Sequence, residues 1–562
     1  MATSKSTQYH AWQPGLDSEL PAALRPLESL YHSQNSSTDY QNTLDLHQLT
    51  GIKQERLAAF TWQRLVLHEL IVRVSANILV PEGDDEELLG QRFRLILDTI
   101  QQQYIQPNAQ QIASDFSQLQ TQIQYDVNNL LDEHLFATVK REPPISGWRA
   151  WFTNPSSEQA QSVEEKQFAA IKNLRQLGLS ATDDYQATLY KSLYVVLSAI
   201  ATHRGRLPND RALLQTLITN HMSNDYGSRF IGHKLAPLME TAIVEQGYER
   251  VQNANKPVLI SLKGASAAGK STLRPLLQED MVEHGLDSQN FAIISPDIWR
   301  RLLLDYDSLG DDFKYAGRLT GKEVNIVDGK LDSYIRAKAE HRHAIPHLLV
   351  DRFRFDSFSS KKIADVLHNT YVKYVDTMHM YFVITPPEAT VDRGWLRGLD
   401  RGRYKSVEDF LGHSVEAYEG MPRLFFKWMA YDKPDFKYHF VDNQVPKGTR
   451  PRLVAYGDQK LMTVIDPLLL VNIMRYQHIN IHAQIPEQVY QDPAAQSISD
   501  NCQFLLQCIA TLPQVDFIVA QDASAYVQFL SGKARIIDND CLQQQCQQPQ
   551  LQQVFIALGL GS

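Results

Sequence analysis

Apolar residues recur at helical spacing through the first 250 residues of this 562-residue chain. They fall three or four positions apart, as on one face of a helix. The clearest stretches are 57–79, 91–105 and 110–136. A segment rich in Pro and Ser, 141–157, interrupts the pattern, and we expect its Trp148 and Trp151 to be packing residues. The pattern predicts an all-helical N-terminal region over 1–250, split near 141–157, whose surface is a candidate site for a protein partner.

Beyond residue 254 the pattern changes to short apolar runs separated by helix-like stretches. The runs are PVLISL (257–262), FAIIS (291–295), HLLV (347–350), MYFVIT (380–385) and YHFV (438–441). Buried parallel strands that alternate with helices have this appearance, because both faces of such a sheet are covered. The pattern therefore predicts an α/β domain over 254–466, with ligands at the carboxyl ends of its strands.

The C-terminal part of the chain shows a third pattern. The stretch RLVAYGDQKLMTVID (452–466) predicts a β-hairpin that closes the α/β domain, with Gly457 and Asp458 near its turn. Residues 467–562 are apolar at helical spacing and then rich in Gln. For these residues we expect a small, mostly helical C-terminal domain.

Composition places the chain among soluble globular proteins, with 43% hydrophobic and 21% charged residues. The net charge of −9 argues against a protein that coats nucleic acid. The acidity is uneven, because residues 251–450 hold 29 basic and 27 acidic side chains and the rest of the chain holds 26 and 37. The α/β part is therefore the less acidic one, which suits a site for anionic ligands.

The first residues, MATSKSTQYHAWQPG, contain no apolar segment of the kind found in secretory signals. No apolar run elsewhere is long enough to span a membrane. The cysteines fit neither a zinc pattern nor a disulfide framework; they are Cys502, Cys508, Cys541 and Cys546. We therefore expect reduced thiols, no membrane contact, and a cytoplasmic location or export into another cell by a different route.

The segment GASAAGKST follows the first apolar run and precedes a helix-like stretch. It fits the phosphate-binding pattern G-x-x-x-x-G-K-[ST], in which glycines let successive backbone N–H groups point into one concavity. Lys270 would reach the β- and γ-phosphates of ATP, and the Ser271 hydroxyl would bind Mg²⁺. A strand, this loop and a helix in succession predict a P-loop NTPase-type parallel sheet flanked by helices. The residues expected to bind ATP are Gly264, Ala265, Ser266, Ala267, Ala268, Gly269, Lys270, Ser271 and Thr272.

Two of the later apolar runs end at an aspartate. Asp297 comes 26 residues after Ser271 and would lie beside the loop, where a carboxylate can take the proton from an attacking hydroxyl. It can also hold a magnesium-bound water, or cap the helix that follows. Asp351, at the end of HLLVD, has the Walker B pattern and is a candidate Mg²⁺ ligand or acceptor contact.

The segment VDRGWLRGLDRGR (391–403) combines arginine with glycine. On a helix, Arg393, Arg397 and Arg401 would share one face, and Arg403 follows closely. A glycine after each of the first three arginines weakens that helix, so the sequence predicts a mobile lid whose guanidinium groups bind phosphate. The alternative is a solvated face paired with the aspartates of the same segment.

Two weaker signals concern the ligands. The run KYHFVDN ends at Asn443, a position from which a loop can pack on the adenine of ATP. The interval 301–345 is longer than a crossover helix needs, and such an insertion near strand ends can build an acceptor pocket. Lys322, Glu323 and Asn325 are candidates for that pocket, and the alternative is that they are solvated.

Together these motifs resemble the zeta-toxin group of P-loop kinases, over about 254–445. The group includes bacterial toxins that phosphorylate UDP-N-acetylglucosamine, and related effectors delivered into plant cells phosphorylate NAD. The resemblance implies Lys270 and Ser271 on ATP–Mg²⁺, Asp297 as general base, and the lid arginines on the phosphates. The chain departs from the toxins at HLLVDR, where they usually have Glu followed by a small residue.

The sequence therefore predicts an ATP-dependent kinase that transfers the γ-phosphate to a hydroxyl of a nucleotide, dinucleotide or nucleotide sugar. A polynucleotide-end kinase would use the same core, but the acidic chain shows no basic stripe with interleaved aromatic residues. Two different functions would also use a phosphate loop. One is a P-loop ATPase or switch that drives the helical region, and the second is a protein that only holds ATP.

Overall fold

The computed structural model divides into two compact units. We call them the sheet unit, Met1–Ala22, Val72–Leu97 and Gly247–Ser562, and the helical unit, Ala23–Ile71 and Asp98–Gln246. The structure describes residues 9–81, 83, 86–136, 162–283, 286, 291–342, 344–351, 373–446, 448–521 and 523–560. The predicted break at 141–157, with Trp148 and Trp151, lies outside the described residues.

The helical unit is built from helices with polar caps. Helices wholly or mostly within it are α1 (Tyr40–Thr50), α2 (Trp62–Asn77), α4 (Ala109–Leu131), α5 (Val163–Ser180), α6 (Asp184–Arg204), α7 (Arg211–Met222) and α8 (Ser228–Gln246). Asp183 and Asp210 cap α6 and α7, because their carboxylates accept otherwise unpaired backbone N–H groups. Buried Leu, Ile and Val side chains of α4, α6 and α7 form the core. The predicted helical character of this part of the chain is confirmed.

The described residues of the sheet unit form a ten-stranded sheet in the order β10-β9-β8-β7-β6-β5-β4-β1-β3-β2. Five parallel strands come first in the sequence: β1 (Val258–Lys263), β2 (Phe291–Ile294), β3 (His347–Asp351), β4 (Thr377–Ile384) and β5 (Asp435–Asp442). Each contains or overlaps one of the predicted apolar runs, so the α/β prediction is confirmed here. β1 is the middle one of these five parallel strands, between β3 and β4, and its carboxyl end is therefore a favoured place for a ligand.

Five further strands extend the sheet beyond β5. They are β6 (Arg452–Gly457), β7 (Leu461–Val464), β8 (Gln514–Phe517), β9 (Val527–Leu530) and β10 (Lys533–Ile536). β6 and β7 form the predicted hairpin, whose turn is fixed by Asp458. The Asp458 carboxylate accepts from the backbone N–H groups of Lys460 (2.7 Å) and Leu461 (3.1 Å).

The structure corrects the prediction of a separate, mostly helical domain over 467–562. β8 pairs with β7 in parallel, and β9 and β10 continue the same sheet. Phe504 packs against Phe425 and Phe440 of the α/β core, with both ring-centroid distances 5.5 Å. The C-terminal residues therefore belong to the sheet unit, with helices α17 (Pro467–Arg475), α18 (Pro493–Gln496), α19 (Gln503–Thr511), α20 (Asn539–Gln545) and α21 (Pro549–Ala557).

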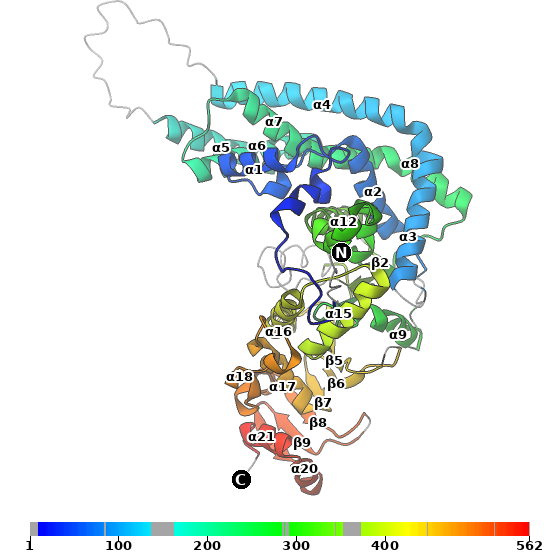
Figure 1. The fold of residues 1–562 in the computed structure, drawn as a ribbon, viewed down its shortest axis with the longest axis vertical. Helices are drawn as coiled ribbons and strands as arrows, with labels where there is room; N and C mark the ends of the chain where they lie inside the picture. Colours follow the sequence, from blue (N-terminus) through cyan, green and yellow to red (C-terminus); the bar gives the residue numbers. More distant parts are fainter. Residues whose placement is uncertain are drawn as a thin grey trace, which may run out of the picture. The chain divides into compact units, whose positions relative to one another are not determined.

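Further helices complete the sheet unit. They are α3 (Glu86–Ile100, mostly in this unit), α9 (Lys270–Glu283), α10 (Arg300–Leu303), α11 (Ala316–Leu319), α12 (Gly321–Arg342), α15 (Pro387–Arg401) and α16 (Val407–Met429). Figure 1 shows α16 and α17 beside the strands β5 to β7. The α15 and α16 helices contact one another, and most of the predicted lid belongs to α15.

The structure also corrects the predicted boundary at residue 250. Asn77 Nδ2 donates to the Tyr334 hydroxyl of α12 (3.1 Å), and Lys338 Nζ donates to Asn77 Oδ1 (2.9 Å). Trp12 packs against an apolar cluster that includes Val391. Two segments of the predicted N-terminal region are therefore part of the sheet unit, held there by long-range contacts that local sequence patterns do not reveal.

None of the helices that the structure describes is both long and apolar enough to cross a membrane. The four cysteines are free thiols, and Cys502 and Cys508 are buried. Burial raises the pKa of Cys502 to about 11, which keeps that thiol protonated and unreactive at neutral pH.

Candidate functional site

The predicted phosphate loop leaves the carboxyl end of β1 and leads into α9. Ala267 and Gly269 have positive φ angles, 60° and 92°, so the chain turns sharply at both positions. A Cβ atom at Gly269 would lie 2.0 Å from Asn443 Nδ2, so this position requires glycine. Left-handed residues spaced in this way can aim backbone N–H groups into a concavity that binds anions.

The loop is supported from the ends of β4 and β5. The Ala268 carbonyl accepts from Asn443 Nδ2 (2.7 Å) and from Thr385 Oγ1 (3.1 Å). The Tyr418 hydroxyl of α16 fixes Thr385, because it accepts from the Thr385 N–H and donates to the Thr385 carbonyl, both at 2.8 Å. Asn443 is thus a support of the loop, and its contact with adenine stays a prediction.

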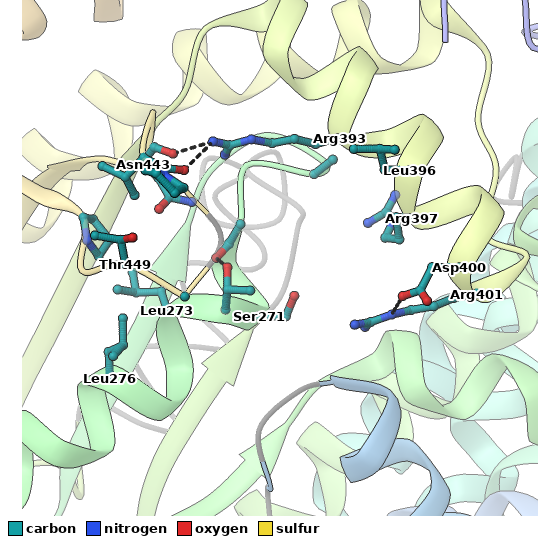
Figure 2. Close-up of a pocket in the computed structure, with 17 residues that line it drawn as sticks. Ser271, Leu273, Leu276, Arg393, Leu396, Arg397, Asp400, Arg401, Asn443 and Thr449 are labelled. Atoms are coloured by element: carbon teal, nitrogen blue, oxygen red, sulfur yellow. Dashed lines mark hydrogen bonds and ion pairs between the residues drawn. The ribbon is translucent and has the colours of Figure 1, made fainter. Parts of the chain in front are cut away.

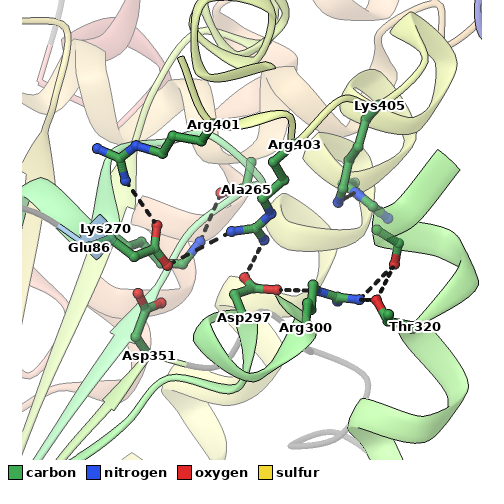
Figure 3. Close-up of polar contacts among 12 residues, drawn as sticks. Glu86, Ala265, Lys270, Asp297, Arg300, Thr320, Asp351, Arg401, Arg403 and Lys405 are labelled. Carbon is green, nitrogen blue, oxygen red and sulfur yellow. Dashed lines mark hydrogen bonds and ion pairs between the residues drawn. The ribbon is translucent and has the colours of Figure 1, made fainter. Parts of the chain in front are cut away.

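Lys270 begins α9 and folds back over the loop (Figure 3). Its Nζ donates to the carbonyls of Gly264 (3.1 Å) and Ala265 (3.0 Å). Burial lowers the pKa of the Lys270 ammonium group, and the nearby carboxylates of Asp351 and Asp297 oppose that change. A phosphate would be a stronger partner for this cation than the neutral carbonyls, because a hydrogen bond between two charged groups is stronger.

Asp297 lies in the turn that follows β2, and both of its carboxylate oxygens contact arginine. Oδ1 accepts from Arg300 Nε (2.9 Å), and Oδ2 accepts from Arg403 Nη2. Burial alone would raise the pKa of Asp297, but the guanidinium groups of Arg403 and Arg300 hold it well below its usual range. Arg300 is fixed in turn by the carbonyl of Gly317 (2.6 Å) and the hydroxyl of Thr320 (3.0 Å). Asp297 is therefore ionised and firmly oriented.

Asp351 ends β3 in a different environment. Its Oδ2 lies 3.6 Å from Nη1 of Arg274, a fully buried side chain of α9. Burial raises the pKa of Asp351, and the positive charges of Lys270 and Arg274 offset this effect only in part. Asp351 is thus a buried carboxylate on the same edge of the sheet as Lys270 and Asp297 (Figure 3).

The arginines of the predicted lid have separate surroundings. Arg393 Nη2 donates to the carbonyl of Asn443 (2.7 Å) and so supports the end of β5. Nη1 of Arg401 lies 3.7 Å from Oε2 of Glu86, and Nη1 of Arg403 lies 3.8 Å from Oε1 of the same carboxylate. Arg393, Arg397 and Arg401 all lie on the helix α15 and line one cavity, as the predicted shared face requires, although each guanidinium group has different neighbours.

Arg397 differs from the other three. Its Nε and Nη2 atoms are buried and have no hydrogen-bond partner among the described residues. Burial, with repulsion from Arg403, lowers the pKa of Arg397 to about 9. Burying an unpaired cation is costly, so this guanidinium group is a candidate binding group for an anion.

The glycines of α15 allow close packing. A Cβ atom at Gly394 would lie 2.0 Å from Cζ of Phe410, and one at Gly398 would lie 2.4 Å from Cδ1 of Tyr404. The sequence predicts that these glycines make the lid mobile. The structure gives them another role, because without them α16 and the segment after α15 could not approach this helix so closely.

A cavity of about 400 Å³ lies between the phosphate loop and α15 (Figure 2). Its polar wall consists mainly of Gly269, Ser271, Thr272, Arg393, Arg397, Arg401 and Asn443. Its apolar wall consists mainly of Leu273, Leu276, Leu396, Val445, Pro446 and Pro451. Figure 2 shows Arg397 and Arg401 across the cavity from Ser271. The volume and the mixed lining are typical of small-molecule sites.

Three further residues of the site are missed by sequence reasoning. Glu86 comes from the N-terminal part of the chain, where no motif marks it. Arg300 stands three residues after Asp297, a spacing that allows an ion pair at the start of a helix and could have indicated it. Lys405 lies just beyond the predicted lid, and its Nζ is 3.0 Å from Nδ1 of His413. Burial lowers the pKa of both groups, that of His413 to about 2.

The predicted acceptor residues lie apart from the cavity. Glu323 is buried at the start of α12, and Asn325 is exposed. Of the described residues that line the cavity, none is Lys322, Glu323 or Asn325. Their role in an acceptor pocket stays a prediction.

Comparisons of the chain with protein-family models, with curated proteins and with solved structures found no match. Within the described residues there is no group of three or more His, Cys, Asp or Glu side chains placed to hold a metal ion. The resemblance to the zeta-toxin kinases therefore rests on the motifs alone.

Proposed function

We propose that this chain is an ATP-dependent kinase that transfers the γ-phosphate to a hydroxyl of a small, nucleotide-like molecule. The observation that carries the proposal is the meeting of two anion-binding features at one cavity. They are the loop Gly264–Thr272 and the buried guanidinium group of Arg397, whose Nε and Nη2 have no hydrogen-bond partner among the described residues. A curled backbone loop and an unpaired cation both favour phosphate.

The lining of the cavity supports ATP as the donor. Leu273, Leu276 and Val445 offer apolar surface for a nucleobase. Arg397 offers positive charge for phosphates from the cavity wall, and Lys270 offers it from the adjoining loop. A nucleoside triphosphate has this division into an apolar base and a charged tail.

Mg²⁺ fits the residues at the loop. The Ser271 hydroxyl and the Asp351 carboxylate would hold it together with phosphate oxygens and water, a ligand set that Mg²⁺ commonly uses in nucleotide sites. When bound, the ion would offset the negative charge of the phosphates. A cation there would also favour the ionised form of Asp351, whose pKa burial now raises.

In the proposed step the acceptor hydroxyl oxygen forms a bond to the γ-phosphorus. The bond from that phosphorus to the bridging oxygen breaks, and ADP leaves with its electron pair. Asp297 accepts the hydroxyl proton and then releases it to water. The low pKa of Asp297 is compatible with this role. In a loose transition state the bond to the leaving group is largely broken before the new bond forms, so the rate depends mainly on how the reactants are positioned and little on the strength of the base.

Arg403 would link the binding of the nucleotide to the orientation of Asp297. Its guanidinium group contacts the Asp297 carboxylate and lies near the carboxylate of Glu86. A phosphate that attracts Arg403 would free Oδ2 of Asp297 to face the acceptor hydroxyl. Arg300 would keep the carboxylate oriented through Oδ1. The Arg403 guanidinium group would then stabilise the charge that develops during transfer.

The test is a search for the phosphorylated product. The full chain is incubated with ATP, Mg²⁺ and a small-molecule extract, and mass spectrometry identifies compounds that gain a phosphate. NAD and UDP-N-acetylglucosamine are tried first, and an oligonucleotide with a free 5′-hydroxyl tests the polynucleotide-end acceptor. We expect Lys270→Ala to reduce product formation by about 100-fold or more, because it removes a charge that stabilises the transferring group.

Lys437→Ala is the matched control, since Lys437 lies on β5 with its Nζ near Asp435 (3.9 Å) and away from the cavity lining. This variant should retain wild-type transfer. Release of ADP and inorganic phosphate with no phosphorylated acceptor would indicate an ATPase and contradict the proposal.

A further inference from the structure

The carboxylate of Glu86 lies among arginines of the proposed phosphate site (Figure 3). Its Oε2 is 3.7 Å from Nη1 of Arg401, and its Oε1 is 3.8 Å from Nη1 of Arg403. The three side chains are largely withdrawn from solvent, with 12%, 14% and 18% exposed. Each carboxylate oxygen therefore faces a different guanidinium group inside a partly desolvated site.

Glu86 reaches this site from outside the P-loop part of the chain. It is the first residue of α3, within the segment Val72–Leu97 of the sheet unit. The next residue, Glu87, has a different partner, because its carboxylate binds Arg94 at 2.8 Å. Of these two adjacent glutamates, Glu86 is the one that contacts the lid arginines.

A carboxylate can take the place of a phosphate oxygen at a guanidinium group, because both present negatively charged acceptor oxygens. The separations at Glu86 are longer than the 2.7–3.2 Å of an ordinary hydrogen bond, so attraction between charges holds it without tight hydrogen bonds. Glu86 also adds to the negative charge around Asp351. A phosphate that binds both arginines at shorter distance could therefore displace it.

We propose that Glu86 occupies the place of the terminal phosphate of ATP and competes with that phosphate for Arg401 and Arg403. This inference rests on the proposed function. ADP can bind while Glu86 remains in place, whereas ATP must displace it. Glu86 is therefore a specificity-determining residue that weakens the binding of ATP relative to ADP. Because of Glu86, Arg401 and Arg403 bind the nucleotide only when it carries a γ-phosphate.

The test is to measure the Kd of ATP and of ADP, each with Mg²⁺, by calorimetry on the full chain. Glu86→Gln removes the charge and keeps the shape of the side chain. It should bind ATP about tenfold more tightly, because the ion pairs of Glu86 with Arg401 and Arg403 no longer compete with the phosphate. ADP affinity should stay within about twofold, since ADP lacks the phosphate for which Glu86 substitutes.

Glu87→Gln is the matched control, because it removes the same charge one residue away and leaves the Glu86 contacts intact. Its affinities for ATP and ADP should equal those of the wild type. Glu86→Asp keeps the charge on a shorter side chain and should give an intermediate ATP affinity.

Two results separate this inference from the proposed function. ATP affinity that is unchanged or weaker in Glu86→Gln, with ATP still bound by the wild type, would overturn the role of Glu86 alone. No ATP binding by the wild type or by either variant would overturn the nucleotide site and the role of Glu86 together.

Discussion

Asp297 and Asp351 look alike in the sequence and differ in the structure. Each lies at or just beyond the carboxyl end of an apolar strand of the parallel sheet, and both lie near Lys270. Asp297 contacts Arg300 and Arg403, which hold its pKa well below the usual range. Asp351 lies beside buried Arg274, and burial raises its pKa.

The difference shows how one strand-end pattern can serve two roles. Asp297 is ionised and held by two cations, Arg300 and Arg403. Asp351 is a carboxylate whose burial outweighs the positive charge near it, so binding a further cation would stabilise it. We therefore expect Asp297 to act on the acceptor and Asp351 to act on the metal, and the following predictions test that division.

The largest effect is expected from Asp297→Asn. Loss of the base and of the Arg403 contact should reduce kcat about 100- to 10,000-fold. ATP should still bind, because Asp297 is not among the residues that line the cavity. Steady-state kinetics and calorimetry check this. A large loss of ATP affinity with kcat retained would contradict the role of Asp297 as the base and indicate a role in ATP binding.

Asp351→Asn should have a smaller effect, of a different kind. We expect the Mg²⁺ concentration for half-maximal activity to rise about tenfold, because one anionic ligand is lost. At saturating Mg²⁺ the turnover should recover most of its wild-type value. A titration of activity with Mg²⁺ measures this. A loss of turnover that no Mg²⁺ concentration restores would mean that Asp351, like Asp297, acts on the acceptor.

The smallest effect concerns stability at acid pH. The usual pKa of both carboxyl groups is 3.8, lowered in folded Asp297 and raised in folded Asp351. Ionised Asp297 therefore contributes stability above about pH 4, and this is lost as the pH falls through its lower folded pKa. Protonated Asp351 contributes stability below about pH 4, and this is lost as the pH rises through its higher folded pKa.

Urea unfolding from pH 3 to pH 7, on the wild type and both Asn variants, measures these contributions. The stability lost in Asp297→Asn should grow with pH to about 1–2 kcal/mol, a value reduced by solvent screening of the partly exposed carboxylate. The difference between wild type and Asp351→Asn should change with pH in the opposite direction. If the stability difference from the wild type changes with pH in the same direction for both variants, the environments of Asp297 and Asp351 do not differ as described.

Much of the α/β fold could be predicted because its signals are local. Each of β1 to β5 is a short apolar run, and the β6–β7 hairpin has Gly457 and Asp458 at its end. The spacing of Gly264, Gly269 and Lys270 marks the loop. The C-terminal strands could not be recognised, because β8 and β9 are short and only alternately buried, and every residue of β10 is exposed.

The partners of the site residues could not be predicted, because they come from distant parts of the chain. Glu86 meets Arg401 across more than 300 residues of sequence. The role of Gly394 depends on where Phe410 packs, which the local pattern does not give. The separate surroundings of the lid arginines likewise follow from tertiary contacts, such as that of Arg393 with the Asn443 carbonyl.

The most direct test follows the phosphate itself. ATP labelled in its γ-phosphate is incubated with the full chain, Mg²⁺ and the extract, and the label is traced in the wild type and in Asp297→Asn. We predict that the label enters an organic product through a phosphate ester in the wild type, and that this transfer nearly stops in Asp297→Asn. Label found only in inorganic phosphate, or transfer by Asp297→Asn at the wild-type rate, would contradict it.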